Sequence, residues 1–208
     1  MTDNTAKKKN RYKYKGEAGY IRFKKSFELA MALGLLLIAA AVFTVGLALN
    51  EWNKGNIFTI IACLFVIPMA RFATSFVLLF PFKSVSAEKA EEVASHARKG
   101  SIIYADVILT SDSKAMGLDF MVVTGDKILG VVSRAKDNNL EIRNYLQDVV
   151  KRRGFDYKVT IAEDYTRFYT LLNNSDSVDA ADFDSEEERE CFDNERAQLC
   201  STLESLMP

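Results

Sequence analysis

Side chains that commonly carry out chemistry are scarce in this chain, and they are widely spaced. His96 is the only histidine, which excludes a metal site built from several histidines. Of the three cysteines, Cys63 lies in an apolar run, whereas Cys191 and Cys200 lie in an acidic tail. They are too few and too scattered for a disulfide framework or a zinc site, and they fit a reducing compartment. We therefore expect no catalytic residue, no bound metal and no other cofactor.

Sequence motifs for nucleotide and hydrolase chemistry are also missing. The chain contains no G-x-x-x-x-G-K-[ST] phosphate loop, no G-x-S-x-G nucleophile elbow and no G-x-G-x-x-G fingerprint. His96 lies near Arg98 and Lys99 on an expected helix, where a surface histidine is the simpler interpretation. These observations favour a protein that is not an enzyme.

Two long apolar segments predict a membrane-spanning hairpin. Residues 29–49 carry no charge, and at about 1.5 Å per residue such a helix crosses a hydrocarbon layer of roughly 30 Å. The second segment, residues 57–82, is interrupted by Pro68 and Arg71. Only residues 50–56 separate the two, so the helices must be antiparallel neighbours. A cleaved signal peptide is the rival interpretation of the first segment, but a long basic stretch precedes it and a second apolar segment follows.

The distribution of positive charge predicts the orientation of this hairpin. Lysine and arginine crowd the chain before the first segment, whereas the link has only Lys54. The positive-inside bias then places both termini in the cytoplasm of a multi-pass cell-membrane protein, with Trp52 at the outer interface. Each basic residue beside an anionic leaflet gains about 1 kcal/mol, so we expect lipid contact rather than nucleic-acid binding. The expected lipid-contacting residues are Lys7, Lys8, Lys9, Arg11, Lys13, Lys15, Arg22, Lys24 and Lys25.

Arg71 is the one ionisable residue expected inside the membrane. Such a residue is by default a functional site, although neither span carries an acid to pair with it. Arg71 lies about 21 Å along a helix that starts at Ile57, from where its guanidinium can nearly reach the inner boundary. We favour this snorkelling interpretation, with Pro68 kinking the helix. Small residues on the first helix permit close approach of the second: Gly34, Ala39, Ala40, Ala41 and Gly46.

The chain after the hairpin predicts a small cytoplasmic α/β domain, residues 84–173. Ser86 is a plausible N-cap for the first helix, and Gly125-Asp126 makes a two-residue turn between strands. The expected order is α-β-β-β-α-β-α. Its segments are a helix from 87 to about 99, strands at 101–110, 118–124 and 127–133, a helix at 140–153, a strand at 157–162 and a helix at 164–172.

This order resembles the core of the restriction-endonuclease-like nuclease fold. The resemblance implies a metal site with an acid on the second strand and an acid-x-lysine on the third, so that carboxylates hold Mg²⁺ and lysine assists the attacking water. Asp119 stands at the first position and Lys136 could be the lysine, but Arg134 stands where the second acid is required. Glu91 or Glu92 could contribute, although each is more simply a solvated helix residue. Of the two interpretations that the resemblance allows, a fold relative without catalysis is favoured over an active nuclease.

A second resemblance concerns the N-terminal residues Tyr14-Lys-Gly-Glu-Ala-Gly-Tyr20-Ile21 and the Pro68-x-x-Arg71 pattern. These residues resemble those of small membrane proteins with two transmembrane helices from Gram-positive bacteria. The resemblance implies topology and no activity.

The last segment, residues 174–208, is acidic. Ser185 and Glu188 make a capping box that opens a helix to about Leu206. Phe192, Leu199, Leu203 and Leu206 fall on or near one face, so this helix either docks on the domain or a partner, or frays in solvent.

The sequence therefore predicts four parts: a basic segment at 1–28, the hairpin at 29–83, the domain at 84–173, and an acidic linker and helix at 174–208. The leading hypothesis is a membrane protein whose hairpin anchors a non-catalytic interaction module, as a homodimer or in a larger membrane complex. The alternatives are a membrane-anchored nuclease-like enzyme with a rearranged metal site, and a small oligomeric channel or transporter in which Arg71 lines the pore.

Overall fold

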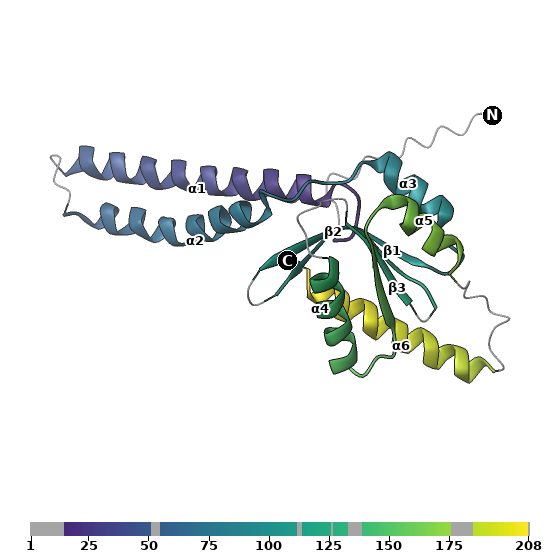
Figure 1. Ribbon diagram of the computed structural model, residues 1–208. Coiled ribbons are helices and arrows are strands. Elements are labelled where there is room, and N and C mark those ends of the chain that lie inside the picture. The colour runs from purple at the N-terminus through teal and green to yellow at the C-terminus, as the bar shows by residue number, and fades with distance from the viewer. Residues whose placement is uncertain are drawn as a thin grey trace, which may run out of the picture. The chain divides into compact units, whose positions relative to one another are not determined.

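The computed structural model describes residues 15–50, 55–111, 114–125, 127–132, 139–175 and 185–207. The chain divides into two compact units. The hairpin unit is Ile21–Lys83, and the α/β domain combines residues 1–20 with residues 84–208. Two long apolar helices and a small mixed sheet covered by helices are thus present, as the sequence predicts (Figure 1).

The hairpin unit consists of two helices, α1 (Tyr20–Leu49) and α2 (Ile57–Leu79), each long and apolar enough to cross a membrane. Helix α1 begins nine residues before the predicted apolar segment, so its first turns carry part of the basic stretch. Helix α2 is capped by Asn56, whose side chain accepts a 2.9 Å hydrogen bond from the Thr59 amide. Pro68 lies inside α2, where it removes one backbone donor.

The two helices pack closely at Gly46. A Cβ atom at Gly46 would lie 2.3 Å from the Phe58 Cβ atom, so only glycine fits there. Its carbonyl accepts hydrogen bonds from the side-chain amides of Asn50, at 2.9 Å, and Asn56, at 3.1 Å. Of the other small residues singled out in the sequence, Ala39 is buried, whereas Ala40 and Ala41 are exposed and Gly34 has nothing within 4 Å of its Cβ position.

The outer surface of the hairpin unit is apolar. Leu37 and Ile67 are each 70% exposed, and many other large apolar side chains of α1 and α2 are exposed as well. They include Leu29, Leu33, Leu36, Ile38, Val45, Leu49, Ile57, Ile60, Leu64, Val66 and Val77.

The α/β domain is built on a four-stranded sheet in the order β1-β2-β3-β4. Strands β1 (Ile102–Thr110), β2 (Ala115–Val123) and β3 (Lys127–Val131) form an antiparallel meander. Strand β4 (Lys158–Ala162) runs parallel to β3, and α4 (Asn139–Arg152) makes the crossover that a parallel pair requires. The remaining helices are α3 (Ala87–His96), α5 (Tyr165–Asn173) and α6 (Glu186–Ser205).

Helices cover both faces of the sheet (Figure 1). On one face, α4 and α6 contribute Ile142, Leu146, Leu199 and Leu203 to a core with β1 and β2. On the other face, α3 and α5 contribute Val93, Phe168 and Leu172 to a second core. The N-caps predicted at Ser86 and Ser185 are confirmed, because each side chain accepts the amide three residues on, and Asp164 caps α5 in the same way.

The acidic C-terminal helix is part of the domain, which settles the alternatives left open by its sequence. Leu199 and Leu203 are fully buried. The buried Arg196 guanidinium donates to the carbonyls of Gly100 and Val123, which ties α6 to the start of β1 and the end of β2. The domain core thus extends past residue 173, where the sequence places a boundary.

Candidate functional site

Strands β1 and β2 change face halfway along their length. Tyr104 and Val107 are three residues apart and would point to opposite faces of a regular strand, yet both lie in the α4/α6 core. Their register partners Met121 and Leu118 do the same. The change occurs at Asp106 and Asp119, which face each other in the register between the pairs Ala105↔Phe120 and Val107↔Leu118.

Asp106 is the residue that makes the change of face possible in β1. Its φ angle is +53°, which places it in the left-handed region that aspartate and asparagine tolerate better than other side chains. Its side chain is buried, with 3% of the residue exposed. A carboxylate so deep in a sheet requires hydrogen-bond donors.

Donors from two distant segments bind the Asp106 carboxylate. Oδ2 accepts the Gly19 amide at 2.8 Å and the Ser84 hydroxyl, and Oδ1 accepts the Val85 amide at 2.7 Å. Gly19 immediately precedes α1, whereas Ser84 and Val85 follow the hairpin unit. We call these four residues the Asp106 clasp. Through the Asp106 side chain, the clasp holds two segments of the domain. One is the segment by which the chain leaves the domain, and the other is the segment by which the chain returns to it.

The N-terminal segment is attached to β1 by further contacts beside the clasp. The Ala105 amide donates to the Gly16 carbonyl at 2.7 Å. Gly16 has a φ angle of +85°, and a Cβ atom there would lie 2.6 Å from the Tyr104 ring. Both the backbone conformation and the close contact therefore require glycine. The Lys15 ammonium donates to the Met207 carbonyl at 3.0 Å. Residues at the start of the described chain therefore contact both β1 and the end of the chain.

Asp119 is paired with a tyrosine from α5. The Tyr165 hydroxyl donates to Asp119 Oδ2 at 2.7 Å, and the Lys89 ammonium lies 4.4 Å from the centre of the Tyr165 ring. The pKa of Tyr165 is raised mainly by burial, and the hydrogen bond to Asp119 and the charge of Asp106 raise it further. The phenol thus stays protonated and acts as a donor to the carboxylate, not as a base.

The metal site implied by the nuclease resemblance is not assembled in the part of the chain that the structure describes. Strand β3 reads Lys-Ile-Leu-Gly-Val and carries no carboxylate. Glu91 and Glu92 are exposed on α3, and the described residues hold no group of three metal-ligating side chains. Arg134 and Lys136 lie outside the described residues.

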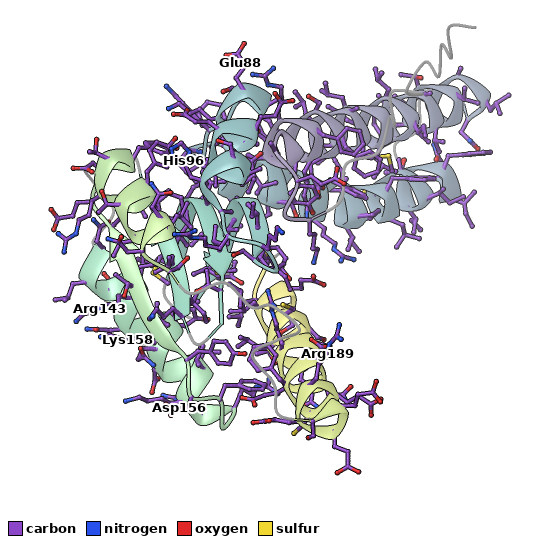
Figure 2. The ribbon with its side chains drawn as sticks, turned by 90° about the vertical axis from the view of Figure 1, so that its right-hand side faces the viewer. Glu88, His96, Arg143, Asp156, Lys158 and Arg189 are labelled. Carbon is purple, nitrogen blue, oxygen red and sulfur yellow. The ribbon has the colours of Figure 1, made fainter. Side chains whose placement is uncertain are left out.

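Three cations gather in an open groove between α4 and β4. Arg143 and Lys151 come from α4 and Lys158 from β4, and Figure 2 shows Arg143, Lys158 and Asp156 along one side of the domain. The cavity has a volume of about 530 Å³, and its remaining lining is Asn144, Gln147, Asp156, Tyr157 and Val159. We call this surface the basic groove. Its lining carries three positive charges against one negative charge.

Arg71 is exposed on α2 and has no hydrogen bond or ion pair with any residue that the structure describes.

Of the expected lipid-contacting residues, Lys7, Lys8, Lys9, Arg11 and Lys13 lie outside the described residues. Lys15 binds the Met207 carbonyl, and Lys25 donates to the carbonyls of Phe80, at 2.9 Å, and Phe82. Lys25 thus serves carbonyls at the end of α2 that have no helical partner. Arg22 is exposed and Lys24 is partly buried.

His96 stacks on Tyr169, with ring centres 4.6 Å apart and planes 21° apart, at the partly exposed surface of α3 and α5.

Sequence reasoning missed Asp106. A signal for it was present, since Asp106 is the one charged residue in the apolar run from 102 to 109. A lone charge in a buried strand marks either a partnered carboxylate or a site.

Comparison with known proteins gives no relative: no family, no curated protein and no solved structure matches the chain.

Proposed function

We propose that this chain is a membrane-anchored interaction protein, in which the hairpin unit spans a bilayer and the α/β domain binds a partner on the cytoplasmic side. The observation that carries the proposal is the apolar outer surface of α1 and α2, exemplified by Leu37 and Ile67. Water-soluble monomeric proteins rarely expose a large contiguous apolar surface. Lipid is the solvent in which such a surface is stable.

The lengths of the helices support the same assignment. Helix α2 has 23 residues, which at about 1.5 Å per residue exceeds a hydrocarbon layer of roughly 30 Å. Helix α1 has 30 residues, enough to cross the layer and to carry its basic first turns into the headgroups. Two antiparallel spans return the chain to the side from which it came, and the basic residues before Leu29 favour the cytoplasm.

The Asp106 clasp supports an interaction module rather than an enzyme. Its carboxylate is fully engaged by Gly19, Ser84 and Val85, so it has no free oxygen to offer a substrate. The clasp instead secures the two membrane-proximal segments on the sheet. We infer that holding them there is the role of Asp106 in β1.

The test is the topology of the full chain in cells. Trp52→Cys and Ser95→Cys are each introduced after Cys63, Cys191 and Cys200 are replaced by serine or alanine, and a membrane-impermeant maleimide is applied to intact cells. We expect labelling at position 52 from outside, labelling at position 95 only after permeabilisation, and retention of the chain in membranes after carbonate washing. Release by carbonate, or protection of position 52, contradicts the proposal.

The nuclease-like alternative is separated by a metal-binding measurement. If the domain is not a nuclease, the full chain in detergent shows no saturable heat of Mg²⁺ or Mn²⁺ binding. The Asp119→Ala variant then gives the same heats as the unaltered chain. A saturable signal that Asp119→Ala removes would favour the enzyme instead.

A further inference from the structure

The basic groove brings three cations from two elements to one cavity. Arg143 and Lys151 stand on α4 and Lys158 on β4, and all three residues are exposed. The Arg143 guanidinium donates at 3.4 Å to the side-chain oxygen of Asn144, which is neutral and leaves the positive charge in place. None of the three cations forms an ion pair with a residue that the structure describes. The groove therefore attracts anions.

The two cations of α4 lie in a row on one face of the helix. Arg143, Gln147 and Lys151 follow one another at intervals of four residues, which places them on the same face. At about 1.5 Å per residue, the two ends of this row are about 12 Å apart along the helix axis. A ligand with two or more anionic groups therefore matches the row better than a ligand with one.

Lys158 stands beside the middle of this row. Gln147 donates to the Tyr157 carbonyl and accepts from the Val159 amide, both at 2.9 Å, and these two residues flank Lys158 in β4. The same two hydrogen bonds occupy main-chain groups with which an added strand would pair. Recognition in the groove therefore proceeds through side chains and not through strand addition.

The size and lining of the groove favour phosphate groups on a small ligand. Its volume of about 530 Å³ is in the range of small-molecule sites. Arginine and lysine are the side chains that proteins use most to bind phosphate, the first as a fork of donors and the second as a point charge. The aromatic residue of the lining, Tyr157, is buried, so it offers no ring on which a nucleobase could stack.

We propose that the basic groove binds a small ligand with two or more phosphate groups, either a free oligophosphate or the headgroup of a phospholipid. Arg143 and Lys151 bind the two ends of the phosphate array, and Lys158 binds its middle. Asp156, the acid in the lining, opposes binding by its charge. Because the contacts are ionic and open to solvent, they weaken as salt screens them. This binding goes beyond membrane anchoring and does not depend on the orientation of the hairpin unit.

The test is calorimetric titration of inorganic tripolyphosphate into the full chain in detergent. We expect saturable binding at about 50 mM salt and much weaker binding at about 500 mM. Orthophosphate should bind at least about tenfold more weakly than tripolyphosphate, because a single phosphate group reaches fewer of the cations.

Neutral substitutions in the groove should weaken the binding of tripolyphosphate. Each single change should cost about two- to fivefold in affinity, and the triple variant at least about tenfold. The changes are Arg143→Gln, Lys151→Gln and Lys158→Gln. Arg152→Gln is the matched control, because Arg152 shares the last turn of α4 with Lys151 but lies outside the groove and pairs with Asp148 at 2.7 Å. The control should bind tripolyphosphate as the unaltered chain does.

A variant with a gain in affinity guards against loss of binding by misfolding. Asp156→Asn removes the acid from the groove, so it should bind tripolyphosphate more tightly than the unaltered chain. A misfolded chain would not show such a gain. Circular dichroism compares the folding of all the variants.

Competition with lipid distinguishes the two sources of phosphate. Displacement of tripolyphosphate by micelles containing cardiolipin, but not by micelles of phosphatidylcholine, assigns the groove to a lipid headgroup. No displacement by either assigns it to a free oligophosphate.

Absence of saturable binding to both tripolyphosphate and cardiolipin overturns the proposal. So does equal affinity for orthophosphate, full binding by the triple variant, or an equal loss in the Arg152→Gln control. Stronger binding of polyglutamate than of tripolyphosphate also overturns it, since the groove then receives an acidic protein. These measurements need no bilayer, so a failure here leaves the labelling test of topology untouched.

Discussion

Asp106 joins two demands that are rarely met by one residue, a left-handed backbone and a buried charge. Hydrogen bonds to a charged acceptor each contribute roughly 1.5–3 kcal/mol, and Asp106 accepts those of Gly19, Ser84 and Val85. The backbone requirement is separate, since a side chain other than aspartate or asparagine adds about 1 kcal/mol of strain at a positive φ.

We expect Asp106→Ala to lower the free energy of unfolding of the domain by about 3 kcal/mol or more, because it removes the charged acceptor and keeps the strained backbone. Asp106→Asn should lose less, because asparagine tolerates the backbone and retains one acceptor oxygen. Pulse proteolysis of the full chain at rising urea concentration measures both. Asp156→Ala, at an exposed aspartate, is the control, and an equal loss in all three variants would refute the role of the clasp.

The buried tyrosines predict the behaviour of the domain at alkaline pH. Burial is the main cause that raises the pKa of both Tyr165 and Tyr104. The Tyr104 hydroxyl also donates to Glu204 at 3.1 Å. The unfolded chain releases these protons near the ordinary tyrosine pKa of about 10, and the folded domain does not. Stability is therefore complete below about pH 10 and falls as pH rises above it.

Absorbance at 295 nm tests this assignment. In the folded protein at about pH 11 we expect Tyr165→Phe to leave the ionisation signal unchanged, because Tyr165 is not ionised there. In urea the same substitution should remove the signal of one tyrosine. A loss of signal in the folded protein would show that Tyr165 ionises freely.

At the level of residues, the sequence predicts what depends on local geometry. Ser86 and Ser185 cap helices as predicted, because the sequence alone determines which side chain stands before a helical turn. The clasp could not be predicted in this way, because its donors at 19 and 85 are brought to Asp106 only by the folded sheet.

Helices α1 and α2 depend on glycine at one point of their contact. Gly46→Val should destabilise the hairpin unit, because its Cβ atom would overlap that of Phe58 and the helices cannot separate without losing the hydrogen bond from Asn56 to the Gly46 carbonyl. Gly34→Ala is the matched control, because nothing lies within 4 Å, and its higher helix propensity should stabilise α1 by up to about 1 kcal/mol. Thermal aggregation in detergent compares the two variants.

Helix α6 is held by its second half. Leu203→Ala removes a fully buried side chain and should lower the free energy of unfolding by about 2–5 kcal/mol. Glu187→Ala, on the exposed half, should change it by less than about 0.5 kcal/mol. Truncation at Asn173 should expose the core under α6 and cause aggregation, measured by sedimentation. Equal stability of all these chains would mean that α6 is not part of the core.

At the level of elements, apolar periodicity predicts most helices and strands of the domain, whereas two features escape it. Helix α1 extends back to Tyr20, because charged residues beside a helix can continue it without contributing to an apolar run. The change of face at Asp106 and Asp119 breaks the two-residue repeat on which strand prediction relies, so neither burial pattern could be predicted from alternation.

At the level of the whole molecule, the sequence predicts two parts correctly, a pair of long apolar helices and a small mixed-sheet domain. It divides the rest differently from the structure. Residues 15–19 and α6 pack with the domain because Gly16, Arg196 and Leu203 make contacts with residues far away in the sequence. Such contacts leave no local periodicity in the sequence. The orientation in a membrane and both family resemblances stay predictions.

The clasp also sets the order in which the chain can fold during its synthesis. Gly19 and Asp106 are 87 positions apart, and Lys15 and Met207 are 192 apart. At roughly 5–20 residues per second, the ribosome adds Asp106 about 4–17 s after Gly19. Until then the amide before α1 has no acceptor on the sheet. The segment from Lys15 to Gly19 therefore takes its final place only after Asp106 and Met207 have both been made.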